Sequence, residues 1–500
     1  MRRAPRRRPA SLGLAAGAAA AAFALTLAAC GSAGTSRSAG DSRSTGAPVH
    51  GTGQVSRSSA TSTSGAAAPI RAAAADRTNW PTYDRVGGRS GVSISTPALK
   101  TGSSVKHGWT TKLDGDVLGQ PLVVGSHILV ATENDTVYAL GRWTGKVVWS
   151  RHLGTPVSSG LACSGDIHPS GITGTPAEDV AAARLYVVTL TATPSIHHTL
   201  WTLDSATGKV VRSRPIDGPG SVPSAEQQRG ALVIDGSKVY VAYGGIDGDC
   251  GPYKGWVVGA PLNGSGGLVH FVTHNQREAG IWAPPGPVVG PGGIYTATGN
   301  GTPPNAVDDS DSVLRLSPKT LGVWSRFTPS NYPILSENDT DLGSTSPALL
   351  PANNVFMIGK EGVGYVLGAD HLGGTGGQLT RTQICSGGFG GDAVDGDLVV
   401  LSCFDGLYAV RYTPGHGKVK PKLAVAWSIT GIQPGPPIIA GNVVWDATRG
   451  NDLIGARLGS GSEVAHFGLN SVGSAFPSLS AAAGRLFVPE GAEVTSYKGI

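Results

Sequence analysis

The chain has 500 residues, of which 75 are Gly and 34 are Pro, and its formal net charge is +5. Gly is about twice as frequent as the ~7% of average proteins, and short apolar runs bounded by Gly, Pro, Asn or Asp recur without sustained helical periodicity, which indicates an all-β chain. The first 29 residues carry five Arg and no acidic residue, so the remainder is close to neutral and its net charge does not favour a nucleic-acid partner.

The N-terminus has the pattern of an export signal. An Arg-rich start is followed by an apolar stretch from about Leu12 to Ala29, which ends in Leu27-Ala28-Ala29-Cys30. This spacing resembles a bacterial lipobox, so we expect cleavage after residue 29 and lipidation of Cys30, against an ordinary cleaved signal or a single membrane span. Residues 30–78 are rich in Ser, Gly and Ala, and we expect a disordered tether there.

From residue 79 to residue 500 the chain reads as one repeating β domain. Short apolar strands begin units about 40 to 60 residues apart, which is the spacing of propeller blades. We count about eight units. Their first strands begin near Gln120, Gly174, Arg229, Pro284, Thr345, Asp392, Pro436 and Phe476. The sequence therefore predicts an eight-bladed β-propeller.

The last unit stops after three strands, at Ile500. Residues Lys106–Leu113, at the start of the domain, could supply the missing outer strand. A blade shared by both ends of the domain closes the ring and removes open sheet edges.

Four cysteines remain in the domain, and in an exported chain they predict two disulfides rather than four free buried thiols. The sequence alone permits three pairings. We favour Cys385–Cys403, because 18 residues comfortably span adjacent strands or blades, and this choice leaves Cys163 to pair with Cys250.

Two units end in a similar way, with Tyr138-Ala139-Leu140-Gly141-Arg142-Trp143-Thr144-Gly145-Lys146-Val147-Val148-Trp149 and Leu203-Asp204-Ser205-Ala206-Thr207-Gly208-Lys209-Val210-Val211. The pattern resembles the repeat of quinoprotein-type propellers, in which Thr-Gly forms a turn and the Trp docks on the next blade. Trp109, Trp324 and Trp427 end other units. The best-known members of that family are alcohol dehydrogenases that use pyrroloquinoline quinone (PQQ) and Ca²⁺.

The resemblance extends to residues that would hold such a cofactor. Gly280-Ile281-Trp282 precedes Thr298-Gly299-Asn300, which is similar to the family's Trp followed by T-G-N. Trp282 would then stack on the quinone and Asn300 would be an amide ligand to Ca²⁺. The alternatives are a Trp that packs between blades and an ordinary Gly-Asn turn.

Two further stretches match the family more loosely. Glu337–Gly343 resembles the acidic stretch that supplies the catalytic base, so that Asp339 or Asp341 would take the substrate proton, against an Asx-rich turn. Lys360-Glu361-Gly362-Val363-Gly364-Tyr365 is similar to a strand pair whose basic residue reaches the cofactor, which assigns that role to Lys360, against an exposed hairpin lysine.

Two departures argue against the enzyme. The family's vicinal cysteines are replaced by Cys163-Ser164, and the run that should supply a Glu ligand holds Asp249-Cys250. Asp249 would then be the only carboxylate near the metal, and Cys163 and Cys250 would bond to each other if both loops face the axis. There is also no C-x-x-C-H haem site.

We therefore expect an exported, lipid-anchored monomer on the outer face of the cell membrane that binds a small molecule or a protein at one face of the propeller. The alternatives are a PQQ- and Ca²⁺-dependent alcohol or sugar dehydrogenase and an envelope-assembly scaffold. The last resembles the propeller lipoprotein that assists outer-membrane assembly in Gram-negative bacteria.

Overall fold

A computed structural model describes residues 77–100, 104–472 and 476–500. The described chain is almost entirely β, with one short helix, α1 (Tyr332–Glu337), and one 3₁₀ turn (Leu342–Ser344). No helix among the described residues is long and apolar enough to cross a membrane. Residues 1–29 and 30–76, with the predicted lipidation site Cys30, lie outside the described residues.

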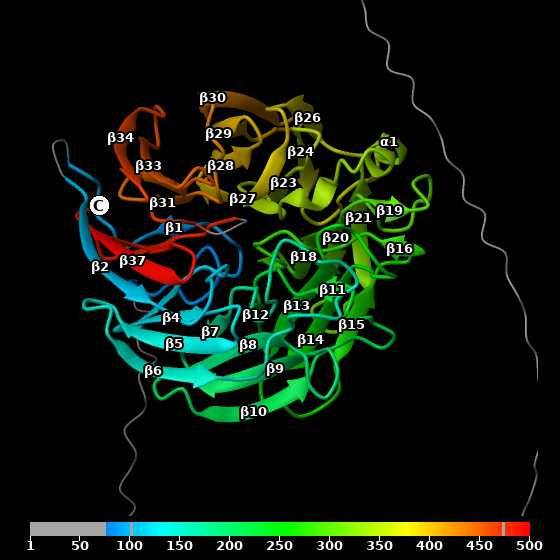
Figure 1. Cartoon of the computed structure of the whole chain (residues 1–500). Coiled ribbons are helices and arrows are strands. Elements are labelled where there is room, and N and C mark those ends of the chain that lie inside the picture. Colours follow the sequence, from blue (N-terminus) through cyan, green and yellow to red (C-terminus); the bar gives the residue numbers. More distant parts are fainter. Residues whose placement is uncertain (1–76, 101–103, 473–475) are drawn as a thin grey trace, which may run out of the picture. The chain divides into compact units, whose positions relative to one another are not determined.

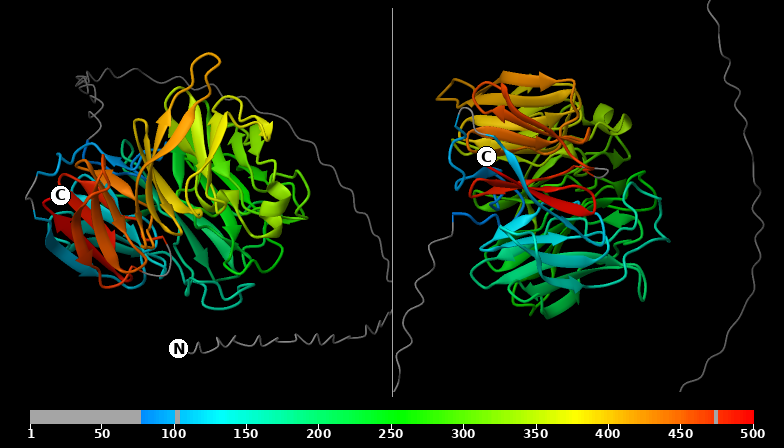
Figure 2. Two further views of the ribbon diagram at one scale, coloured as in Figure 1. Left: turned by 90° about the horizontal axis from the view of Figure 1, so that it is seen from above. Right: turned by 60° about the vertical axis from the view of Figure 1, so that its left-hand side comes forward.

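Eight antiparallel sheets are arranged around a common centre as the blades of a propeller, which confirms the predicted fold (Figures 1 and 2). Each blade has four main strands, which run in order from the inner strand to the outer one. Blade 1 holds β3 (Leu122–Val124), β4 (His127–Ala131), β5 (Thr136–Gly141) and β6 (Val147–His152); blade 2 holds β7 (Ala177–Asp179), β8 (Arg184–Thr191), β9 (His197–Asp204) and β10 (Val210–Pro215); blade 3 holds β12 (Val233–Asp235), β13 (Lys238–Gly245), β14 (Trp256–Pro261) and β15 (Val269–Val272); blade 4 holds β17 (Val288–Gly290), β18 (Gly293–Ala297), β20 (Val313–Leu316) and β21 (Val323–Thr328).

The second half of the ring repeats this plan. Blade 5 holds β22 (Ala348–Leu350), β23 (Asn354–Ile358), β24 (Val363–Gly368) and β26 (Thr380–Gln383); blade 6 holds β27 (Gly388–Asp395), β28 (Leu398–Cys403), β29 (Gly406–Thr413) and β30 (Lys422–Thr430); blade 7 holds β31 (Ile438–Ala440), β32 (Val443–Ala447), β33 (Asp452–Arg457) and β34 (Glu463–Gly468); blade 8 holds β35 (Ser480–Ala482), β36 (Arg485–Pro489), β37 (Glu493–Lys498) and β2 (Lys106–Lys112).

Four features of the sheets were not predicted from the sequence. Strand β25 (Gly374–Thr375) adds in parallel to β21, and β1 (Val92–Ser93) adds in parallel to β31. Strand β11 (Glu226–Gln227) also pairs with β13. A separate ribbon joins β16 (Arg277–Glu278) to β19 (Gly301–Thr302). These additions are two residues long, which is too short to leave a periodic signal in the sequence.

Blade 8 is closed by the two ends of the domain, as predicted. Strand β2 pairs antiparallel with β37, with Lys106 opposite Lys498 and Lys112 opposite Glu493. The side chains of Val494, Tyr497 and Ile500 are at least nine-tenths buried. The closing contact therefore combines a full backbone ladder with core packing.

Tryptophans connect successive blades in the manner that the repeat implies. The Nε1 of Trp149 donates to the carbonyl of Ser205, 3.1 Å away, and the ring lies against Gly208, where a Cβ would have no room. Trp109 and Trp427 make the same contacts at the Gly145 and Gly461 turns. Trp324 differs: it is 54% exposed and has the guanidinium of Arg315 over its ring.

The exposure of Trp324 has a local cause. The next blade replaces the usual Thr-Gly turn after its third strand with a longer excursion, residues 369–379, and β25 within it pairs with β21 along the outer edge. The prediction of docking from the repeat is therefore right for Trp109 and Trp427 and wrong for Trp324.

An N-terminal segment, residues 80–93, occupies the centre of the ring. Trp80 bridges to Val123 of blade 1, and the guanidinium of Arg89 donates to the carbonyls of Leu232 and Pro287 at 3.1 and 3.2 Å. The amide of Ile439 in blade 7 donates to the carbonyl of Gly91. Because one short segment reaches blades on several sides of the ring, we infer that it plugs the axial channel.

Both favoured disulfides are present. Cys385 is bonded to Cys403, and Cys163 is bonded to Cys250 across a separation of 87 residues. Disulfides are typical of proteins outside the cytoplasm. The two disulfides therefore indicate a protein outside the cytoplasm. One joins the connection between blades 5 and 6 to β28, and the other joins the loop before blade 2 to the loop between β13 and β14.

Candidate functional site

A cavity of about 900 Å³, its open mouth included, lies at the centre of the ring, and we call it the axial cavity. Its walls come from loops of blades 2 to 7 and from Phe476, just before blade 8. Six of the residues predicted from the sequence line it, namely Trp282, Asn300, Asp339, Asp341, Lys360 and Asp249. The structure therefore brings together residues that are up to 111 positions apart, while their chemical roles remain predictions.

Lys360 lies at the centre of a charged cluster on one wall. Its Nζ is 2.6 Å from Oδ2 of Asp341 and 3.0 Å from Oδ1 of Asp339. The side chain of Asp341 is only 4% exposed, whereas that of Asp339 is 64% exposed. The other oxygen of Asp341 accepts a hydrogen bond from the backbone amide of Asn300 at 2.7 Å. Both oxygens of the buried carboxylate are thus occupied.

Close backbone approach holds this cluster in place. Gly343 packs against the backbone of Thr298, and Gly359 packs against Asp341 and Leu342, where a Cβ would clash in each case. The amide of Lys360 donates to the carbonyl of Asp341 at 2.9 Å. The acidic stretch after helix α1 is therefore fixed between the Thr298-Gly299-Asn300 turn and the turn that carries Lys360, rather than left as a solvated loop.

Burial shifts the protonation of the neighbouring acids. Burial raises the pKa of Asp341, against the opposing effects of Lys360 and the Asn300 amide. Burial and the charge of Asp341 raise the pKa of Asp311 to about 7, although Ser336 and the amide of Leu342 donate to its carboxylate. Burial lowers the pKa of Lys360, but the two aspartates outweigh that effect and raise it overall.

An aromatic wall faces this charged cluster. The ring of Trp282 lies 5.7 Å from that of Phe389 and 6.3 Å from that of Phe476, and the last two rings are 4.7 Å apart. The Nζ of Lys360 lies 5.7 Å from the centre of the Trp282 ring. Trp282 therefore belongs to a cavity wall, rather than to a contact between blades.

Two arginines of the cavity were not identified from the sequence. The guanidinium of Arg229 lies 4.6 Å from the ring centre of Phe476, and that of Arg449 lies 5.8 Å from the ring centre of Phe389. Arg229 is 3.8 Å from a carboxylate oxygen of Asp166. Arg449 differs, because its buried Nε has no hydrogen-bond partner among the described residues. Neither arginine lies in a recognisable motif, so only the fold identifies them.

The opposite rim of the cavity carries Asp249 and the first disulfide. The hydroxyl of Tyr253 donates to the carboxylate of Asp249, and Tyr253 is 3% exposed. Burial and the charge of Asp249 raise the pKa of Tyr253. Cys163 lies beside Gly248, so the Cys163–Cys250 bond borders the mouth. This position agrees with the expectation that the loops carrying Cys163 and Cys250 face the axis.

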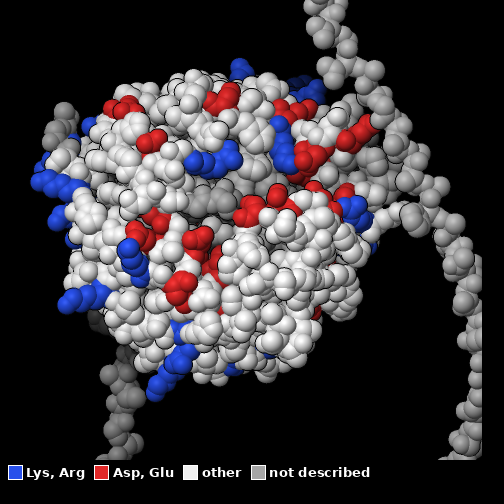
Figure 3. Space-filling view, viewed as in Figure 1, with Lys and Arg blue, Asp and Glu red and all other residues white. Residues whose placement is uncertain are grey.

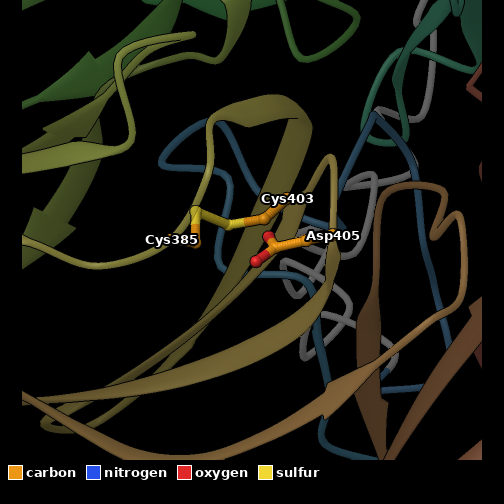
Figure 4. A group of neighbouring side chains, drawn as sticks. All are labelled: Cys385, Cys403 and Asp405. Carbon is orange, nitrogen blue, oxygen red and sulfur yellow. A yellow bond between two sulfur atoms is a disulfide. The ribbon is translucent and has the colours of Figure 1, made fainter. Parts of the chain in front are cut away.

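The acidic residues that the family resemblance places near the cofactor already have partners in the structure. Asp249 accepts from Tyr253, and Asp341 is bonded to Lys360 and to the Asn300 amide. Among the described residues, the one group of three His, Cys, Asp or Glu ligand atoms within 4.8 Å of one another is Cys385, Cys403 and Asp405. Those two sulfurs are bonded to each other (Figure 4), so they are not available as thiolate ligands to a metal.

Comparisons with known proteins agree with the fold and the repeat. Residues 98–246 match a PQQ-type family model described as outer membrane protein assembly factor BamB. No curated protein matches the chain in sequence.

Solved structures match over most of the chain. Quinohemoprotein alcohol dehydrogenase from Comamonas testosteroni is 18% identical, with a TM-score of 0.64, over 86% of this chain and 82% of that one. A europium-containing methanol dehydrogenase is 14% identical, with a TM-score of 0.64, over 85% of this chain and 98% of that one. BamB from Moraxella catarrhalis is 14% identical, with a TM-score of 0.54, over 79% of this chain and 100% of that one. At these identities the likeness concerns the fold. The chain is an eight-bladed β-propeller, and its residues 98–246 are similar to a PQQ-type family model.

Proposed function

We propose that this exported propeller binds a planar, aromatic, anionic small molecule in its axial cavity and acts as a binding module. The observation that supports this most is the buried Nε of Arg449, which has no hydrogen-bond partner among the described residues. The guanidinium lies over the ring of Phe389, which forms an aromatic wall with Trp282 and Phe476. A buried N–H without a partner costs about 1–3 kcal/mol, which a ligand carboxylate would remove. The flat rings would cover the faces of an aromatic ligand.

PQQ is the ligand to test first, because it is planar and carries three carboxylates. Arg449, Arg229 and Lys360 lie around the cavity as candidate partners for those carboxylates. A bound quinone would supply a two-electron acceptor. In this proposal the residues of the chain bind and orient the ligand.

Titration of the purified full-length chain with PQQ, followed by absorbance, tests the proposal. We expect Arg449→Met to weaken binding by about tenfold or more, since a charged hydrogen bond contributes roughly 1.5–3 kcal/mol. Arg151→Met is the matched control, because Arg151 lies on the exposed outer strand β6 and should leave binding unchanged. Failure of the unaltered chain to bind PQQ, or equal binding by both variants, would contradict the proposal.

The dehydrogenase alternative has its own readout. Reduction of a dye by alcohols or sugars, dependent on PQQ and Ca²⁺ and lost in Asp341→Asn with binding retained, would support it. The scaffold alternative rests on the family model that matches residues 98–246 and on the full coverage of the BamB structure. Crosslinking in cells, independent of PQQ, should then recover a protein partner.

We also propose that lipid on Cys30 anchors the chain at the outer face of the cell membrane, because Leu27-Ala28-Ala29-Cys30 follows an apolar stretch. Cys30→Ser is expected to move the chain from the membrane fraction to the soluble fraction. Fractionation with mass spectrometry of the N-terminal peptide measures this. An unmodified Cys30, or unchanged membrane association of the variant, would argue for a different attachment.

A further inference from the structure

A second cavity, of about 800 Å³ with its open mouth, lies beside the axial one. It is lined by the segment that follows β2, the turn between β4 and β5, and the loop before blade 2. Four carboxylates line it, from Asp114, Asp116, Glu133 and Asp166. Figure 3 shows acidic side chains gathered near the middle of the viewed face.

Glu133 is the deepest of these acids. It is 3% exposed, and its Oε2 accepts hydrogen bonds from the amide of Gly171 at 2.7 Å and from the hydroxyl of Thr173 at 3.2 Å. Its Oε1 is buried and has no hydrogen-bond partner among the described residues. Glu133 lines the cavity, so an ammonium group that reached this oxygen would supply the missing donor.

Glu133 lies close to a second buried carboxyl group, that of Asp135. Asp135 is fully buried, and neither of its carboxylate oxygens has a hydrogen-bond partner within the described chain. Burial and then the charge of Glu133 raise the pKa of Asp135 to about 8. Arg229 stacks on Phe476 and lies 3.8 Å from Asp166, and its charge partly opposes the effect of burial on the pKa of Glu133. Burial also raises the pKa of Glu133 to about 7, and a cation bound beside it would favour its ionised form.

The spacing of the ligand atoms in this cavity argues against a bare metal ion. No three carboxylate or imidazole ligand atoms of this cavity lie within 4.8 Å of one another in the described residues. Apolar side chains of Leu118, Ile167 and Pro169 line the space together with the carboxylates. A surface that combines carboxylates with apolar side chains matches a ligand that has both methylenes and ammonium groups.

We propose that this side cavity is a binding site for a linear aliphatic diamine or polyamine. One ammonium group donates to Oε1 of Glu133 at the buried end. The methylenes contact Leu118 and Ile167, and a second ammonium group lies near Asp116 at the exposed rim. The site is separate from the anion-binding arginine Arg449 and does not depend on the function proposed for the axial cavity.

Calorimetric titration of the purified full-length chain with spermidine and with 1,6-diaminohexane, at low ionic strength and without PQQ, tests this. We expect Glu133→Gln to weaken binding about tenfold, because the amide keeps an acceptor for Gly171 but removes the charge. Glu178→Gln is the matched control: Glu178 is 6% exposed and also has one unpartnered oxygen, but it does not line this cavity.

Asp116→Asn provides a second variant on an exposed residue, so a folding defect of Glu133→Gln would not end the test. We expect this variant to bind the diamine severalfold more weakly and to bind hexylamine, which has one ammonium group, with unchanged affinity. Three results would each overturn the proposal: no binding of either amine, hexylamine binding as tightly as the diamine, or unaltered affinity in both acidic-site variants.

Discussion

Deletion of residues 493–500 is expected to abolish the cooperative unfolding transition of the domain. The deletion removes β37, which is hydrogen-bonded to β36 on one side and to β2 on the other, and it removes the buried side chains of Val494, Tyr497 and Ile500. Loss of each such side chain alone costs about 2–5 kcal/mol. Their sum is comparable to the roughly 5–15 kcal/mol that stabilise a typical domain.

Thermal and urea unfolding followed by far-ultraviolet circular dichroism measures the effect of this deletion. The matched control replaces residues 414–421, a segment of equal length between β29 and β30, with an Asn-Gly turn. Thr413 and Lys422 already face each other in the ladder, so a tight turn can join them. A deletion variant that still unfolds cooperatively near the temperature of the intact chain would show that β37 does not close the ring.

Lys360→Met is expected to destabilise the domain by about 3–5 kcal/mol. Lys360 is the cation paired with Asp341, whose side chain is 4% exposed, and removal of one member of a buried ion pair leaves the other charge uncompensated. The double variant Lys360→Met/Asp341→Leu should recover most of the loss, because no charge then stays buried. Urea unfolding measures both values.

The same variant should show a distinct pH dependence. Without Lys360, the buried Asp341 has a folded-state pKa further above its unfolded-state value, so folding favours the protonated form. The loss of stability should therefore be smallest near the unfolded-state pKa of Asp and should grow as the pH rises toward the folded-state pKa. Unfolding free energies measured at several pH values test this sign.

Arg411→Met is the control for Lys360→Met. Arg411 pairs with Asp397 at 2.7 Å, but both side chains are 50% exposed. Exposed ion pairs contribute about 0–1 kcal/mol. Equal losses in the two variants, or a loss in Lys360→Met that does not change with pH, would show that Asp341 is not held by this pair.

The strands were the most predictable feature of the chain. The first strand of unit one was predicted to begin near Gln120, and β3 begins at Leu122; the predicted closing strand from Lys106 to Leu113 contains β2. Central strands such as β4 are buried on both faces, which leaves an apolar run between turn residues in the sequence. The helix α1 and the two-residue strands β1, β16, β19 and β25 lack such a run and were missed.

The candidate site was predictable only in part. Trp282, Asn300, Asp339, Asp341 and Lys360 lie in stretches that resemble a known repeat family, and all of them line the axial cavity. Arg229, Phe389, Arg449 and Phe476 line the same cavity without any such motif. Their side chains meet because their loops leave different blades toward one axis, and a linear pattern does not record that convergence.

The sequence by itself determined that this protein is a ring of β blades, because alternation of apolar runs and turns is a local property that each unit repeats. It also determined which ends of the domain meet, since the last unit is one strand short. Only the tertiary structure decided the chemistry of the centre. The pairing of Lys360 with Asp341 occupies a carboxylate that the family resemblance assigns as a candidate base, and Arg449 and Glu133 each have a buried atom without a hydrogen-bond partner among the described residues. Those outcomes depend on distances between blades, which the order of residues along the chain does not specify.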